Sequence, residues 1–277
     1  MTRKKNAKSD EAMLDEMRTA ITRAMAAAAP ETGSDAELQA YDLYYKAMDT
    51  GDTDFIFQAL ELDPANTDCL LRLLYMFDED DLEALLFAKQ ILAVAEKRLG
   101  PEQFEEYRGE FWGFLETRPY MRARCSLALR LVKTGRIGEA IAEHEGMLEL
   151  CPNDNLGMRY GLLGLYLQED RIKDVSRLLK QYKGEVKYNA VMVWGTVLER
   201  FLSGKPDAAA KALAAARKQN GFLEAYLKGH RKLPKKSAGY YSPGSLEEAQ
   251  MCAELQKPAW DAHPEAVQWL GNVMPGA

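Results

Sequence analysis

The sequence predicts an all-α protein, built as a solenoid of antiparallel helix pairs. Apolar residues recur at steps of three and four, as in Leu70, Leu71, Leu74 and Phe77, which places them on one face of a helix. The alternating β-branched runs that are typical of strands are missing. A turn motif returns about every 34 residues, and this favours stacked helix pairs over a simple bundle.

Composition sets the class of protein. Of 277 residues, 47% are hydrophobic and 28% are charged, a balance typical of globular proteins. The net charge of −6 argues against a surface built entirely for nucleic acid. No window approaches 18 apolar residues, and no apolar stretch follows the basic residues at the N-terminus, so we expect a cytoplasmic protein without a membrane segment.

Local signals mark where helices begin and end. Ser34 with Glu37, and Ser245 with Glu248, match a capping box, in which the two side chains satisfy free backbone amides. Prolines tolerated in a first helical turn are Pro101 and Pro206. Glycines placed to end a helix are Gly135, Gly184 and Gly204. These signals predict about 14 helices joined by short turns.

The repeat motif is a turn between two helices. Gly135–Ala140 (GRIGEA) returns 35 residues later as Asp170–Val175 (DRIKDV), and after a further 34 as Gly204–Ala209 (GKPDAA). Ala140 and Ala209 supply a small residue where two helices approach closely. In period and content the chain resembles the tetratricopeptide repeat family. The resemblance implies a right-handed helical-repeat solenoid, with a concave groove lined by the first helix of each pair.

A second resemblance concerns the C-terminal part. Leu233-Pro234 is followed by the helix start Tyr240–Ala249 and by the spaced tryptophans Trp260 and Trp269. This order is similar to bacterial relatives of the suppressor-of-tumorigenicity-seven family, over roughly residues 119–270. The resemblance implies a helical-repeat interaction protein and carries no catalytic residues. We expect both tryptophans to pack back onto the last repeat, because a solenoid must cover its apolar end.

The chain divides into four segments on this basis. They are an N-terminal polar segment and helix (1–33), an irregular helical-repeat region (34–118), tetratricopeptide-like repeats (119–220) and a C-terminal capping segment (221–277).

Residues that could carry chemistry are scattered. The cysteines lie far apart without a CxxC pair, which is typical of reduced thiols; they are Cys69, Cys125, Cys151 and Cys252. The histidines have no partner at metal-ligand spacing; they are His144, His230 and His263. Nucleophile-elbow and phosphate-loop motifs are missing. We therefore expect no catalytic residue, no cofactor and no metal.

Charge is segregated along the chain. Between Asp49 and Glu83 there are eleven acidic residues and one basic residue, Arg72, whereas Arg118 to Arg136 holds six basic residues and no acidic one. Regions of opposite sign can steer a charged partner or dock against each other.

The function that these features favour is a non-catalytic interaction scaffold, binding a peptide or partner helix in the concave groove. The inner-helix windows (121–134, 156–169 and 190–203) contain no asparagine and only one lysine, Lys133, so they do not match the lysine and asparagine clamp with which some tetratricopeptide proteins hold chaperone tails. They offer aromatic and guanidinium groups instead. The candidate groove residues are Arg122, Arg124, Arg159, Tyr160, Tyr166, Trp194 and Arg200.

Three alternatives stay open. Tyr160 and Trp194 could be core residues between helices. The protein could bind nucleic acid through its basic stretches 118–136 and 228–236, in which case its affinity would fall steeply with salt. The partner could also be a second copy of the chain, in a homodimer.

Overall fold

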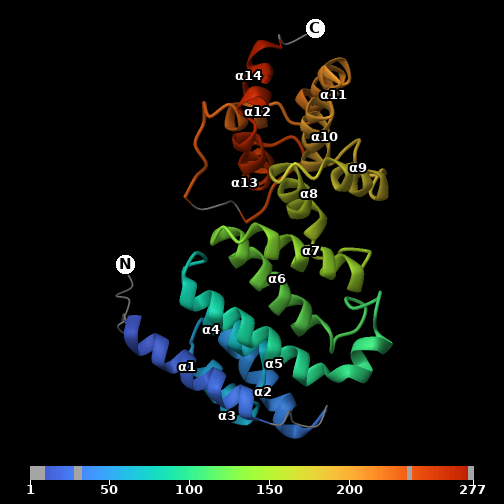
Figure 1. Ribbon diagram of the computed structural model, residues 1–277. Coiled ribbons are helices and arrows are strands. Elements are labelled where there is room, and N and C mark those ends of the chain that lie inside the picture. Colours follow the sequence, from blue (N-terminus) through green and yellow to red (C-terminus); the bar gives the residue numbers. More distant parts are fainter. Residues whose placement is uncertain (1–9, 28–32, 236–238, 274–277) are drawn as a thin grey trace. The chain divides into compact units, whose positions relative to one another are not determined.

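The computed structural model describes residues 10–27, 33–235 and 239–273, which form fourteen α-helices and no strand (Figure 1). The all-α class is thus confirmed for the described part of the chain. The chain forms two compact units, residues 1–156 and 157–277.

Unit 1 contains seven helices, and helices that follow one another in the chain pack together. Its helices are α1 (Asp10–Ala26), α2 (Asp35–Thr50), α3 (Asp54–Leu62), α4 (Thr67–Leu74), α5 (Leu82–Glu106), α6 (Arg118–Lys133) and α7 (Ile137–Leu150). The closest pairs are α2 with α3, α6 with α7 and α5 with α6, while α1 lies on α5. Helix α5 breaks at Gly100, whose φ of 72° is left-handed, immediately before Pro101.

Unit 2 contains the other seven helices. They are α8 (Met158–Gln168), α9 (Ile172–Gln181), α10 (Ala190–Leu202), α11 (Pro206–Gln219), α12 (Leu223–Leu227), α13 (Leu246–Ala262) and α14 (Pro264–Asn272). Here α10 packs against α11 and α8 against α9, as the repeat predicts. Helix α13 returns from the C-terminal segment to lie on α8, α10 and α12 (Figure 1).

Both predicted capping boxes form. Ser34 and Ser245 accept hydrogen bonds from the backbone amides of Glu37 and Glu248. Each glutamate carboxylate reaches back one residue beyond the cap, to the N–H of Gly33 at 2.6 Å and of Gly244 at 2.7 Å. The two helix starts far apart in the chain are therefore built in the same way.

The three copies of the repeat motif share one turn structure. A left-handed residue ends the first helix in each copy: Gly135 (φ 73°), Asp170 (φ 54°) and Gly204 (φ 69°). The amide of the next residue then donates to the carbonyl five residues earlier, in the pairs Arg136 to Leu131, Arg171 to Tyr166 and Lys205 to Arg200. The small or β-branched residue at the end of the motif is fully buried in every copy; these are Ala140, Val175 and Ala209. Gly184 does not end a helix, because α9 already stops at Gln181.

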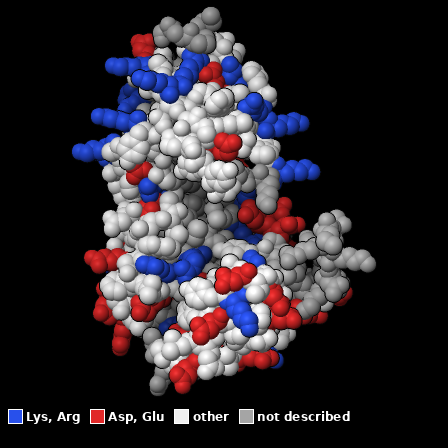
Figure 2. Space-filling model, turned by 180° about the vertical axis from the view of Figure 1, so that it is seen from behind, with Lys and Arg blue, Asp and Glu red and all other residues white. Residues whose placement is uncertain are grey.

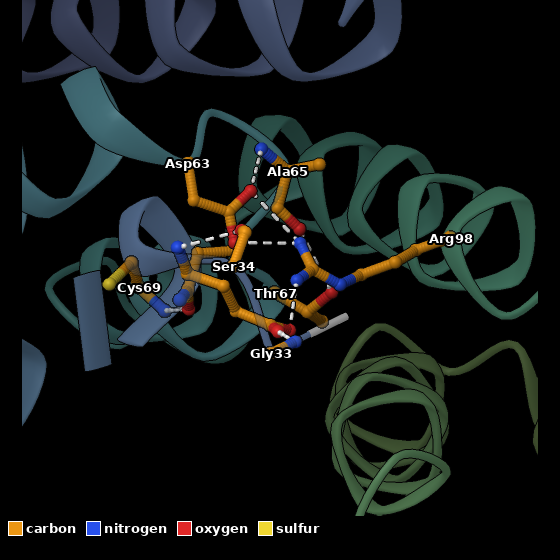
Figure 3. A network of polar contacts seen from close by, with 9 residues as sticks. Gly33, Ser34, Asp63, Ala65, Thr67, Cys69 and Arg98 are labelled. Atoms are coloured by element: carbon orange, nitrogen blue, oxygen red, sulfur yellow. Dashed lines mark hydrogen bonds and ion pairs between the residues drawn. The ribbon is translucent and has the colours of Figure 1, made fainter. Parts of the chain in front are cut away.

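A buried polar network fixes the start of α2 (Figure 3). Asp63, which has no exposed surface, ends α3 and accepts hydrogen bonds from Arg98 Nη1 and from the amide of Ala65. Arg98 Nη2 donates to Glu37 of α2 at 2.7 Å. Burial raises the pKa of Asp63, and the Arg98 guanidinium opposes that rise. The network joins α2 and the α3–α4 turn to α5.

Candidate partner-binding surface

One set of positions recurs on the first helix of several helix pairs. A left-handed residue follows α2, α6, α8 and α10, namely Gly51, Gly135, Asp170 and Gly204. The positions 13, 10, 6 and 3 residues before it are spaced three, four and three apart, so those within the helix lie along one helix face; in α8 the first position, Gly157, is the N-cap residue. We call each set of four a stripe. The stripes are Leu38, Tyr41, Tyr45 and Met48 before Gly51; Arg122, Cys125, Leu129 and Val132 before Gly135; Gly157, Tyr160, Gly164 and Leu167 before Asp170; and Val191, Trp194, Leu198 and Phe201 before Gly204.

In unit 2, the C-terminal helices cover the stripes. Trp194 has no exposed surface and meets Trp260 of α13 edge to face, with ring centroids 6.4 Å apart. On α8, a side-chain carbon at Gly164 would lie 2.2 Å from the carbonyl oxygen of Leu255, so glycine allows the α13 backbone to come this close. The expected packing of Trp260 is confirmed, and it covers the face on which the groove was predicted.

The end of the α10 stripe is covered in the same way. The ring of Phe201 contacts Trp269 of α14 with centroids 5.1 Å apart. On α8, the carbonyl of Leu167 accepts a hydrogen bond from Nε2 of the buried His263, at 2.9 Å. The second predicted tryptophan contact is thus also confirmed.

In unit 1, the stripe of α2 is open. Leu38 is 54% exposed, Tyr45 62% and Met48 48%, while Tyr41 is half-buried. Among the described residues α2 packs extensively only against α3, and its buried residues Ala40 and Ala47 lie away from the stripe. Leu129 in the stripe of α6 is 46% exposed. An apolar and aromatic surface at helix spacing is therefore left uncovered in this unit.

Arg122, the first residue of the α6 stripe, is held by an acidic residue of its own chain. Its Nε and Nη2 donate to the two carboxylate oxygens of Asp68, at 2.7 and 2.6 Å. Asp68 is buried at the start of α4, and two tyrosines of α2, Tyr41 and Tyr44, lie within the field of this ion pair. Burial, with a further contribution from Asp68, raises the pKa of Tyr41 to about 12. Arg122 thus fixes α6 against α4, and only part of its guanidinium is left for a partner.

The other basic residues of stretch 118–136 are also bound within unit 1. Arg124 donates to Glu143 at 2.6 Å, and the buried Arg130 donates to the carbonyls of Asp78 and Leu74. Lys133 lies 3.4 Å from Glu79. Arg122, Arg130 and Lys133 thus join the basic stretch to the acidic region 49–83. The side chains of Lys133 and Arg136 stay 57% and 42% exposed.

Arg159 and Tyr160 form a closed cluster at the start of α8. The Tyr160 hydroxyl donates to Glu185 at 2.6 Å, and Arg159 Nη2 donates to that hydroxyl at 2.6 Å and to Glu185 at 3.1 Å. The guanidinium also lies over the Tyr160 ring. Burial and the bond to Glu185 raise the pKa of Tyr160. This pair is partly exposed, but its polar groups are bound to each other.

Two of the predicted groove residues lie in the core instead. Tyr166 is 3% exposed and Trp194 0%, and the Trp194 indole N–H donates to the carbonyl of Asn220 at 3.2 Å. The prediction of a groove position for these two is wrong: α13 covers Trp194, and Tyr166 is buried within unit 2 with the Arg171 guanidinium over its ring. Arg200 is half-buried, with its Nε 3.3 Å from Glu199.

Sequence reasoning missed the residues of the α2 stripe. The first hundred residues lack the turn motif, so Leu38, Tyr45 and Met48 were not candidates. The signal that could have found them is the spacing of three, four and three ahead of Gly51, which matches the spacing ahead of Gly135.

Three of the four thiols, those of Cys69, Cys125 and Cys252, are poor nucleophiles. Burial raises the pKa of Cys125 to about 11, and it also raises the pKa of Cys69 and Cys252. These thiols are protonated near neutral pH, whereas a reactive cysteine needs its thiolate. Burial lowers the pKa of His144, which lies in α7 with Nδ1 donating to the Ala140 carbonyl at 2.7 Å. Among the described residues, no group of His, Cys, Asp and Glu could hold a metal ion.

The two units carry opposite charge. Unit 1 has 18 basic and 30 acidic residues, a net charge of −12, and unit 2 has 18 basic and 12 acidic residues, a net charge of +6. Figure 2 shows mainly acidic groups over unit 1 on this face, and mainly basic groups over unit 2.

In the stretch 228–236, Lys228 is bound to Glu224 and Arg231 lies over the Tyr226 ring. Lys236 is outside the described residues. No helix in the described ranges has both the length and the apolar character needed to cross a bilayer.

No protein-family model matches this chain, and no curated protein sequence matches it. The resemblances to the tetratricopeptide and suppressor-of-tumorigenicity-seven families therefore stay predictions from the sequence.

Proposed function

We propose that this chain is a cytoplasmic, non-catalytic interaction protein of the tetratricopeptide-like, right-handed helical-repeat kind. Its binding surface is the pair of stripes on α2 and α6 of unit 1, and its ligand is a peptide or helix of a partner protein.

One observation carries this proposal. Stripe residues lie open on α2 and, at Leu129, on α6, whereas a helix of the chain itself, α13, covers the stripe of α10 and the second half of the stripe of α8. In unit 2, therefore, a helix already binds this face of the first helix of a pair. Large side chains such as Tyr45 and Met48, which are already about half-buried, gain on the order of 1 kcal/mol each when a partner removes the rest of their apolar surface from water, and such groups dominate binding energy at interfaces.

Site-specific photo-crosslinking in the native cell tests the proposal. A photoreactive phenylalanine analogue is placed at Tyr45 or Met48 in the stripe, or as the control at Gln39, which is exposed on another side of the same helix. We expect adducts of one defined mass from positions 45 and 48 and none from position 39. Equal labelling at all three positions, or none at any, would overturn the proposal.

A second variant separates specific binding from chance contact. Tyr45→Ser leaves the fold unchanged, since this side chain is 62% exposed, and should abolish the adduct formed from position 48.

A further inference from the structure

The α2 stripe has a charged border on one side. Asp35, Asp42 and Asp49 are exposed, and they follow one another at intervals of seven residues, two helical turns. Each interval advances the position around the helix by only about −20°, so the three carboxylates form a line beside Leu38 and Tyr45. None of them forms an ion pair with another described residue.

The stripe and this border together follow a heptad. Leu38 and Tyr45 occupy the first position, Tyr41 and Met48 the fourth, and Asp42 and Asp49 the fifth. Apolar first and fourth positions form a seam that accepts a second helix, and the charge at flanking positions selects the partner. The residues of α2 that pack inward, Ala40 and Ala47, lie on the side away from this seam.

From this pattern we infer that the partner bound on α2 is an amphipathic helix with Lys or Arg beside its apolar seam. The inference rests on the proposed function and adds the chemistry of the ligand. Three points support it: the acidic border of the seam, the net charge of −12 on unit 1, and the helical form of the segment that covers the equivalent stripes in unit 2. Unlike charges that face each other across an interface attract, and they suppress partners of the wrong sign.

The test uses two designed peptides and measures fluorescence anisotropy with the full chain. Both peptides have three heptads with Leu at the first and fourth positions; one has Lys and the other Glu at the fifth and seventh. Like charges at these positions keep each peptide from pairing with itself. We expect the Lys peptide to bind at least about tenfold more tightly than the Glu peptide at low salt, with the difference shrinking as salt rises.

Protein variants locate the effect. Asp42→Lys with Asp49→Lys should reverse the preference in favour of the Glu peptide. The matched control, Glu102→Lys with Glu149→Lys, changes the net charge equally at exposed sites on α5 and α7 and should keep the Lys preference. If both double variants behave alike, binding follows the overall charge of unit 1, and the inference is wrong.

The outcomes separate the inference from the proposed function. If only the Glu peptide binds, and Tyr45→Ser abolishes that binding, the proposed helix-binding face is supported and the inference that the partner helix is basic is wrong. Binding of neither peptide would overturn both. Reversible self-association in sedimentation that Tyr45→Ser abolishes would identify a second copy of this chain as the occupant, and this too overturns the basic helix.

Discussion

Units 1 and 2 use the same helix face in opposite ways. In unit 2 the stripe of α10 and the second half of the stripe of α8 are part of the core, because α13 and α14 cover them. Val191, Trp194 and Leu198 have at most 1% of their surface exposed. In unit 1 the stripe of α2 contains three large apolar residues that are about half exposed. A face with one spacing thus serves as an internal contact in one unit, and is free for an external contact in the other.

The two units also differ in how far apart in the chain the partners of their arginines lie. In unit 1, Arg122 and Arg130 of α6 bind residues more than fifty positions away, Asp68 and Asp78, and so fix α6 against α4. In unit 2 several arginines pair with carboxylates only three to seven residues away, as Arg177 does with Asp174 and Arg217 with Glu224. Arg122 and Arg130 thus hold the tertiary fold of unit 1, whereas the stripe residues Leu38, Tyr45 and Met48 stay about half exposed.

Leucine occurs at the same stripe position in both units, and this gives the sharpest test. Leu198→Ala in α10 should lower the free energy of unfolding by about 2–5 kcal/mol, because the side chain is fully buried. Leu129→Ala in α6 should cost about 0.5 kcal/mol, because 46% of that residue is exposed. Hydrogen exchange of the amides in α6 and α10 measures both effects locally. If the two substitutions lowered the free energy of unfolding equally, the distinction between a covered and an open stripe would be wrong.

A second test addresses the close approach of α13 to α8. Gly164→Ala places a carbon 2.2 Å from the Leu255 carbonyl and should destabilise unit 2 by about 2–3 kcal/mol, through a backbone shift. As the control, Gly138→Ala in α7 meets no atom within 4 Å and should be neutral or stabilise by up to about 1 kcal/mol. Thermal unfolding of the two variants provides the comparison. A Gly164→Ala protein that melts like the parent would show that α13 does not need this contact.

The smallest expected effect concerns Arg122. Arg122→Ala leaves the buried Asp68 carboxylate without its partner and should cost about 1–3 kcal/mol. Arg177→Ala removes an exposed pair within one helix and should cost less than about 0.5 kcal/mol. Chemical denaturation monitored by circular dichroism measures the difference. If Arg122→Ala caused no loss of stability, Arg122 would not stabilise the fold, and only its predicted role in partner binding would remain.

The sequence by itself determined the helices and their turns. Apolar spacing, the capping residues Ser34 and Ser245, and the three turn motifs are local features, and each is set by residues within about one or two helical turns. They therefore predicted the all-α class, the helix pairs and the buried Ala140 and Ala209, all of which the structure contains.

Only the tertiary structure decided which helix faces are covered. The stripes of α2 and α10 have the same spacing and similar residues, so nothing local separates Tyr41 from Trp194. Helix α13, which begins more than fifty residues after the start of α10, packs on α10 and buries Trp194. Among the described residues, no helix covers the stripe of α2 in this way. In the same way, the pairing of Arg122 with Asp68 joins residues 54 positions apart. Burial and ion pairing depend on which distant segments meet, and this is the information that spacing along one helix cannot carry.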